Sequence, residues 1–162
     1  MGTPILHHLA VLRRDYVAAL LGGGKTVECR LSRVSRPPHG HVATGDWVWF
    51  KQSGGPVRAV ARIGRVHEQN DLTPGRLAGL RARYGRAIQA PASFWETHGA
   101  ARFATLIWLD HICAVQSFKL LKSDRRAWVV LACPPVPGRP LIAHPPARRT
   151  DSGDLLDPRG GT

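Results

Sequence analysis

The chain divides into short runs that favour β-strands, separated by glycine and proline, and its helical patterns are few and brief. Apolar or alternating runs predict strands at 5–12, 25–31, 47–51, 57–67, 104–109 with a continuation after a bend at 112–118, and 128–131. Helical spacing occurs only at 16–21, 74–84 and 92–97. Parallel βαβ units need long helices between strands, so a doubly wound sheet is excluded. We predict an α+β, mostly β, fold: a small mixed β-barrel of five to six strands with two to three flanking helices.

Turn and helix-capping residues support these predicted strands and helices. Gly54 and Gly55 form a turn between two strand-like runs, which predicts a β-hairpin. Thr73 before Pro74 predicts a helix start, Asp15 is a candidate cap for the first helix, and Gly22 is its expected stop.

The sequence changes character after Cys133. Proline, glycine and arginine follow without a sustained period. We therefore predict one domain at 1–133 and an extended or disordered tail at 134–162.

The chain is strongly basic. Lysine and arginine number 23 against 11 acids, and the formal net charge is +12 over 162 residues. Such a charge predicts attraction to polyanions, of which nucleic acid is the commonest. The alternative is a compositional bias towards arginine, in which the additional side chains are merely solvated on the surface.

Other classes of function find little support. The three cysteines are too scattered for a disulfide framework, and no cysteine or histidine spacing suggests zinc, so we expect a reducing compartment, no metal and no cofactor. His39 and His41 lie in a Pro/Gly loop without a carboxylate at ligand spacing. No signal peptide and no apolar run of about 18 residues is present, which predicts a cytoplasmic protein without a membrane partner. The oligomeric state is not indicated.

The segment Gly23 to Arg30 concentrates chemical groups. A glycine turn leads into a strand on whose two faces Lys25, Val27, Cys29 and Leu31 alternate with Thr26, Glu28 and Arg30. An amine, a carboxylate and a guanidinium close together suit a polar, anionic ligand. Gly24-Lys25-Thr26 also matches the end of a phosphate-binding loop. That loop requires strand, loop and helix in order, whereas here a helix precedes and a strand follows.

The same segment carries a family resemblance. Gly23-x-Lys25-x-x-Glu28-x-Arg30 matches the G-x-K-x-x-E-x-R signature of the activating signal cointegrator homology (ASCH) domain, a branch of the PUA-like superfamily. The chain also resembles bacterial ASCH proteins in further blocks that follow in the same order: 36–38, 45–46, 50–56, 94–96, 104–109 and 125–131. The resemblance extends from about residue 5 to residue 131.

The resemblance implies a β-barrel with a basic cleft that binds RNA or another nucleic acid, or a modified nucleoside. One branch of the family is an amidohydrolase that deacetylates N4-acetylcytidine, and others are described as nucleases. By this resemblance Lys25 is a catalytic candidate, and Glu28 stands where the amidohydrolase has threonine. Glu68 and Glu96 are the candidates for its third residue. The alternative function is therefore hydrolysis of a modified nucleoside or RNA through Lys25 and Glu28.

The predicted binding residues come from the signature and from the later blocks. They are Gly23, Lys25, Thr26, Glu28, Arg30, Arg36, Lys51, Ser53, Trp95, Arg125 and Arg126. Two alternatives remain open. Glu28 and Arg30 could pair with each other or with Arg33 only to close the barrel, with Lys25 solvated. Trp95 could be a lid over the cleft or a packing residue, whereas Trp108 and Trp128 are expected in the core.

Overall fold

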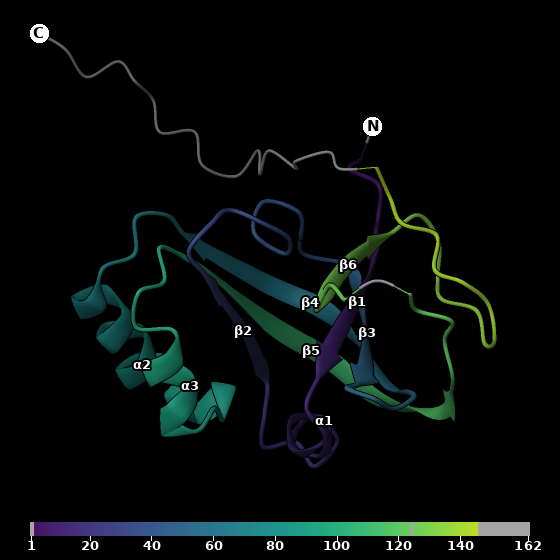
Figure 1. Ribbon diagram of the computed structural model, residues 1–162, viewed down its shortest axis with the longest axis horizontal. Coiled ribbons are helices and arrows are strands. Elements are labelled where there is room, and N and C mark those ends of the chain that lie inside the picture. The colour runs from purple at the N-terminus through teal and green to yellow at the C-terminus, as the bar shows by residue number, and fades with distance from the viewer. Residues whose placement is uncertain (1, 124, 146–162) are drawn as a thin grey trace, which may run out of the picture.

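The computed structural model describes residues 2–123 and 125–145 (Figure 1). Three helices and six strands follow the chain as β1 (His7–Leu12), α1 (Arg14–Leu21), β2 (Val27–Ser32), β3 (Trp47–Gln52), β4 (Val57–Gln69), α2 (Pro74–Ile88), α3 (Ala92–Thr97), β5 (Phe103–Phe118) and β6 (Trp128–Leu131). Every predicted strand and helix is present, and the α+β, mostly β, fold is confirmed. Within the described part of the chain, none of the helices has the length and hydropathy that a bilayer crossing requires.

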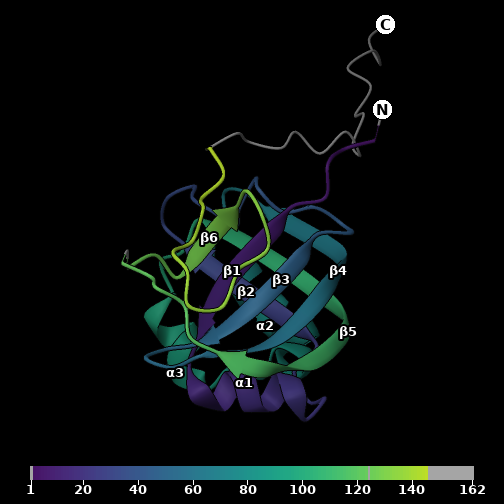
Figure 2. The ribbon, with the colours of Figure 1, turned by 90° about the vertical axis from the view of Figure 1, so that its right-hand side faces the viewer.

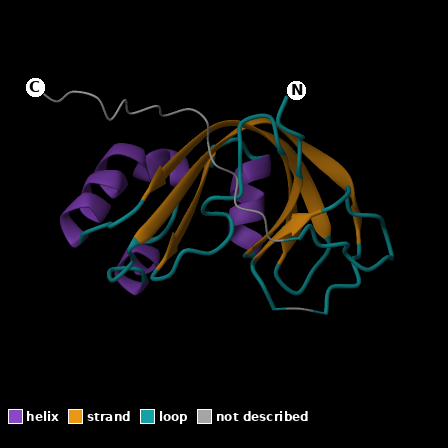
Figure 3. Cartoon of the chain, turned by 90° about the horizontal axis from the view of Figure 1, so that it is seen from above, coloured by secondary structure: helices purple, strands orange, loops and turns teal. Residues whose placement is uncertain are grey.

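The strands form one sheet in the order β2-β5-β4-β3-β1-β6. All neighbours are antiparallel except β1 and β3, which run parallel. The sheet curls into a half-barrel, as Figures 2 and 3 show, and β2 and β6 are its two edges. We call the gap along which β2 faces β1 and β6 the seam.

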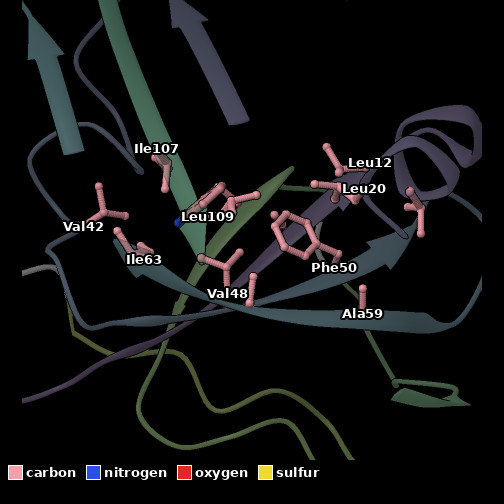
Figure 4. Packing of buried hydrophobic residues seen from close by; sticks show 13 residues of the cluster. Leu12, Leu20, Val42, Val48, Phe50, Ala59, Ile63, Ile107 and Leu109 are labelled. Atoms are coloured by element: carbon pink, nitrogen blue, oxygen red, sulfur yellow. The ribbon is translucent and has the colours of Figure 1, made fainter. Parts of the chain in front are cut away.

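The concave face of the sheet holds the main core. Alternate residues of β3 and β4 point inward, among them Val48, Phe50, Ala59 and Ile63, and all four are almost fully buried (Figure 4). Leu20 of α1 closes this core from one end. The alternation that the sequence shows at 57–67 thus separates core from surface, as expected for a barrel strand.

A second core joins the sheet to α2 and α3, which lie side by side in Figure 1. Val27, Cys29 and Leu31 on the outer face of β2 pack against Leu77 and Leu80 of α2. The apolar face of β2 therefore points away from the half-barrel, and its polar face points into it.

The ends of the elements differ from the predictions in small ways. Thr73 caps α2 as predicted, its hydroxyl accepting from the Arg76 amide at 3.3 Å. The predicted cap of α1 is wrong: the capping position is Arg13, which makes no side-chain cap bond, and Asp15 lies inside the first turn. β5 continues through its bend, where His111 has a φ of 50°.

Part of the predicted tail lies against the body of the protein. The Ala132 amide donates to the Ile142 carbonyl, and the His144 amide donates to the Val130 carbonyl, both at 2.8 Å. The segment 141–144 thus runs beside β6 as an extended strand-like stretch. The division of the chain at residue 133 stays a prediction, and positions 146–162 fall outside the described residues.

Candidate functional site

A pocket of about 890 Å³, the main pocket, opens at the seam. Its walls come from β1, β2, β6, the end of α2 and the loop before β3. Six of the predicted binding residues line it: Lys25, Glu28, Arg30, Arg36, Arg125 and Arg126. Segments far apart in the sequence thus meet here because the half-barrel brings its two edges together.

Lys25 lies at the floor of the main pocket and is only 3% exposed. Its Nζ donates to the Val27 carbonyl at 3.0 Å and the Ile88 carbonyl at 2.8 Å, and lies 3.2 Å from Glu28 Oε2. The Ile88 carbonyl belongs to the last turn of α2, where a cation also complements the helix dipole. Strand alternation would place Lys25 and Glu28 on opposite faces. Because β2 begins only at Val27, Lys25 is free of that alternation and reaches Glu28.

Glu28 is also 3% exposed and has a cation on each carboxylate oxygen. Arg30 Nε donates to Oε1 at 2.7 Å, opposite the Lys25 contact at Oε2. Burial alone would raise the pKa of Glu28, but the charges and hydrogen bonds of Lys25 and Arg30 outweigh it and hold the pKa below its ordinary value. These three side chains, the ion cluster, therefore contain an ionised carboxylate at neutral pH.

Arg30 extends from the ion cluster across the seam. Its Nη2 donates to the Val11 carbonyl on β1 at 3.1 Å, and its guanidinium carbon lies 5.4 Å from the ring centre of Trp128 on β6. One side chain thus contacts both strands on the far side of the gap. Glu28 and Arg30 do pair, as one of the open alternatives supposes, but Lys25 is buried within the same cluster and is not solvated.

The rim of the main pocket is cationic. Arg13, Arg36, Arg125 and Arg126 line it and are exposed. Among the described lining residues, Glu28 is the only carboxylate, and it is already paired with two cations. The pocket therefore presents an excess of positive charge to a ligand.

Aromatic side chains form part of the walls. Tyr16 of α1 lies with its ring centre 5.5 Å from Lys25 Nζ, and Phe94 of α3 lies on another side. Trp128 is buried as predicted, yet it also lines the pocket. Its Nε1 donates to His8 Nδ1 at 3.2 Å, and His8 Nε2 lies 2.9 Å from Asp46 Oδ2, which fixes the indole beneath Arg30.

Sequence reasoning did not find the residues that anchor the loop before β3. His39 Nε2 donates to Asn70 Oδ1 at 2.7 Å, and its Nδ1 lies 3.0 Å from Thr105 Oγ1. His39 and Thr105 both line the main pocket and are buried. These contacts join residues 31 and 66 positions apart, and no local pattern signals them. Among the described residues, no group of three or more His, Cys, Asp or Glu side chains is arranged to hold a metal.

Five predicted binding residues lie outside the main pocket. Gly23 and Thr26 are exposed in the turn before β2, and Ser53 is exposed in the β3–β4 turn. Lys51 on β3 donates to the Gln52 carbonyl at 3.2 Å, and burial followed by the nearby charge of Lys122 lowers its pKa. Trp95 is 5% exposed within the core under α2 and α3, so it is a packing residue and not a lid.

One aromatic residue that was not predicted lines the main pocket, whereas Trp108, Glu68 and Glu96 lie outside it. Phe94, the neighbour of Trp95, turns towards the pocket because successive residues of a helix point about 100° apart. Trp108 is only partly buried: it packs at the edge of the second core, with the Arg65 guanidinium 4.3 Å from its ring centre. Glu68 accepts from the Gly40 amide at 2.6 Å, and neither Glu68 nor Glu96 lines the main pocket.

Comparisons with known proteins agree on the fold. The chain is similar to the crystal structure of the ASCH protein from Zymomonas mobilis, with a TM-score of 0.55 and 19% identity over 68% of this chain and 71% of that chain. A point mutant of that protein gives a TM-score of 0.56 with 19% identity over 70% and 73% of the two chains. No family model and no curated protein sequence matches the chain. The fold is therefore that of ASCH proteins, as the sequence resemblance predicts.

Proposed function

With the ASCH fold as the premise, we propose that this protein binds RNA or a modified nucleoside or nucleotide in the main pocket. The observation that carries the proposal is the combination of an exposed arginine rim with aromatic walls in one pocket of about 890 Å³. A volume of this order is typical of pockets for small organic ligands. Arginine recognises phosphate through two parallel hydrogen bonds, and aromatic rings stack on bases.

The ion cluster supports a binding role over a catalytic one. An ammonium group has three donors, and Lys25 has three acceptors within 3.2 Å. Nucleophilic attack by Lys25 would require its proton to leave and at least one of these contacts to break. A rigid, fully paired floor instead holds Arg30 and the pocket walls in a fixed geometry before the ligand arrives.

Titration with a labelled single-stranded oligoribonucleotide tests this function. We expect binding that weakens with increasing salt, because phosphate contacts release counterions. Arg36→Ala and Arg125→Ala remove rim charges and should each weaken binding about tenfold. Arg139→Ala removes the same charge from an exposed position that does not line the main pocket, and should leave the affinity nearly unchanged. Binding that is absent, or that falls equally in all three variants, would contradict the binding of RNA in the main pocket.

Hydrolysis of a modified nucleoside, or cleavage of RNA, is the second candidate function. It is favoured by one observation: a buried amine and a buried carboxylate lie 3.2 Å apart on the pocket floor. Glu28 could then orient water or move a proton. Incubation with N4-acetylcytidine, followed by chromatography, would reveal cytidine, and incubation with RNA would reveal shorter fragments. If neither cytidine nor RNA fragments rise above the level of a Lys25→Ala control, this chemistry is excluded.

A further inference from the structure

A second and smaller pocket, the side pocket, adjoins the main pocket. Its volume is about 320 Å³. The two pockets share four wall residues, Leu31, Ser32, Arg36 and His98. They are therefore neighbouring compartments with a common wall, in which Arg36 and His98 lie.

The side pocket is also cationic. Arg33 lines it together with Arg36, both side chains are exposed, and none of the described residues around it is acidic. Arg36 lines both pockets, so it lies at the wall that a ligand occupying both of them would contact. A bidentate guanidinium is suited to a phosphate at this position.

The side pocket is also lined by an apolar side chain, Val34, and by the ring of His98. Val34 is 60% exposed and adds apolar surface to the wall of the side pocket. The His98 ring lies 4.6 Å from the ring of Phe94, centre to centre, and its Nδ1 donates to the Phe94 carbonyl at 2.7 Å. The imidazole is thus held in place between the pockets, where a base could stack on it.

The loop that carries both arginines is ordered by its own hydrogen bonds. Ser32 Oγ donates to the Val34 carbonyl at 2.7 Å, and the His39 amide donates to the Arg36 carbonyl at 3.0 Å. The Arg102 amide donates to the Ser32 carbonyl at 2.9 Å. A backbone fixed in this way lowers the entropy that binding would otherwise cost.

We propose that the side pocket is a subsite for a second nucleotide of a single-stranded nucleic acid whose first nucleotide occupies the main pocket. Arg36 binds the phosphate between the two nucleotides, and Arg33 binds the next phosphate along. This inference rests on the proposed function of the main pocket and extends it. The preferred ligand is then an oligonucleotide and not a free nucleoside, and a base must leave any duplex stack to enter.

Calorimetric titration of mononucleotides and dinucleotides, each phosphorylated at both the 5′ and the 3′ end and each in ribose and deoxyribose forms, tests the subsite. We expect dinucleotides of at least one sugar type to bind the wild-type protein about tenfold or more tightly than the corresponding mononucleotides. Arg33→Ala should remove most of that advantage and leave mononucleotide affinity unchanged. Val34→Glu, at an exposed position, should act in the same way because it places a negative charge in the side pocket. The salt slope for dinucleotides should fall by about 0.7 in Arg33→Ala.

The control is Arg139→Ala, which removes an exposed arginine that lines neither pocket and should alter neither affinity. Equal affinity for mononucleotides and dinucleotides of both sugar types would overturn the subsite and leave the main pocket's function intact. Equal weakening of both ligands by Arg33→Ala would also overturn it. If neither ligand binds, the proposed function itself fails, and the subsite fails with it.

Discussion

Arg30 on β2 donates a hydrogen bond of 3.1 Å to the carbonyl oxygen of Val11 on β1, although three strands separate β1 from β2 in the sheet. No backbone ladder joins β2 to β1, and the Arg30 side chain connects the two strands across the seam. Because the same guanidinium binds Glu28, the closure of the half-barrel and the floor of the main pocket depend on one side chain.

Arg30→Lys should therefore weaken both the closure of the half-barrel and the floor of the main pocket. Lysine keeps the charge but lacks the planar fork that reaches Glu28 and Val11 together. We expect the free energy of unfolding to fall by about 2 kcal/mol, because charged hydrogen bonds in a partly buried site are lost. Chemical denaturation measures this, and a change under about 0.5 kcal/mol would show that Arg30 does not hold the seam.

Glu28→Gln should destabilise the protein by about 3 kcal/mol, because it leaves two cations beside a neutral amide in a buried site. The wild-type carboxylate has a lower pKa in the folded than in the unfolded protein. Its ionised form therefore contributes stability that is complete above the ordinary value of 4.5 and is lost as the pH falls through the lowered value. Denaturation series below about pH 5 should show a steeper loss of stability in the wild type than in Glu28→Gln. Parallel slopes would contradict the assignment.

Cysteine reactivity should distinguish the buried thiol of the second core from an exposed thiol on β5. Burial, with the neighbouring charge of Glu28, raises the pKa of Cys29 to about 12, whereas Cys113 is exposed. At neutral pH iodoacetamide should modify Cys113 rapidly and leave Cys29 unmodified until the protein is unfolded in urea. Mass spectrometry of the labelled peptides gives the order, and early labelling of Cys29 would show that the second core opens readily.

Gly23→Ala should cost about 1 kcal/mol of stability, since Gly23 has a φ of 81°, which an alanine adopts only with strain. Asparagine tolerates this region better, so Gly23→Asn should cost less. No atom lies within 4 Å of a Cβ built at this position, which leaves backbone strain as the cause. Thermal denaturation distinguishes the two variants, and equal losses would point to a different cause.

Trp95→Ala and Phe94→Ala should separate packing from binding. Trp95 fills the second core, so its truncation should cost about 3 to 5 kcal/mol. Phe94 is only half-buried and lines the main pocket, so its truncation should weaken oligonucleotide binding with a smaller loss of stability. Thermal denaturation and the RNA titration measure the two effects. The opposite pattern would return Trp95 to the role of a lid.

The sequence predicts the elements well because they depend on local patterns. Thr73 before Pro74, and the glycine pair at the β3–β4 turn, act within a few residues. The signature also predicts that Glu28 and Arg30 share the polar face of a strand, and they do.

The walls of the pocket could not be predicted in the same way. His39 meets Thr105 across 66 positions, and the Ile88 carbonyl reaches Lys25 across 63, so both contacts depend on how the sheet curls. The choice between Phe94 and Trp95 depends on the rotation of a helix of six residues, which propensity does not determine. Lys51 is among the predicted binding residues but does not line the main pocket, and no local pattern indicates this.

The hydrogen bonds from the Ala132 and His144 amides along β6 have a consequence for solubility. An edge strand with unpaired amides and carbonyls is a template on which another molecule can add its own strand. Here the chain occupies that template itself with residues 141–144. A protein truncated after Leu131 would keep every residue of the ion cluster, yet it would expose the β6 edge and become prone to aggregation between molecules.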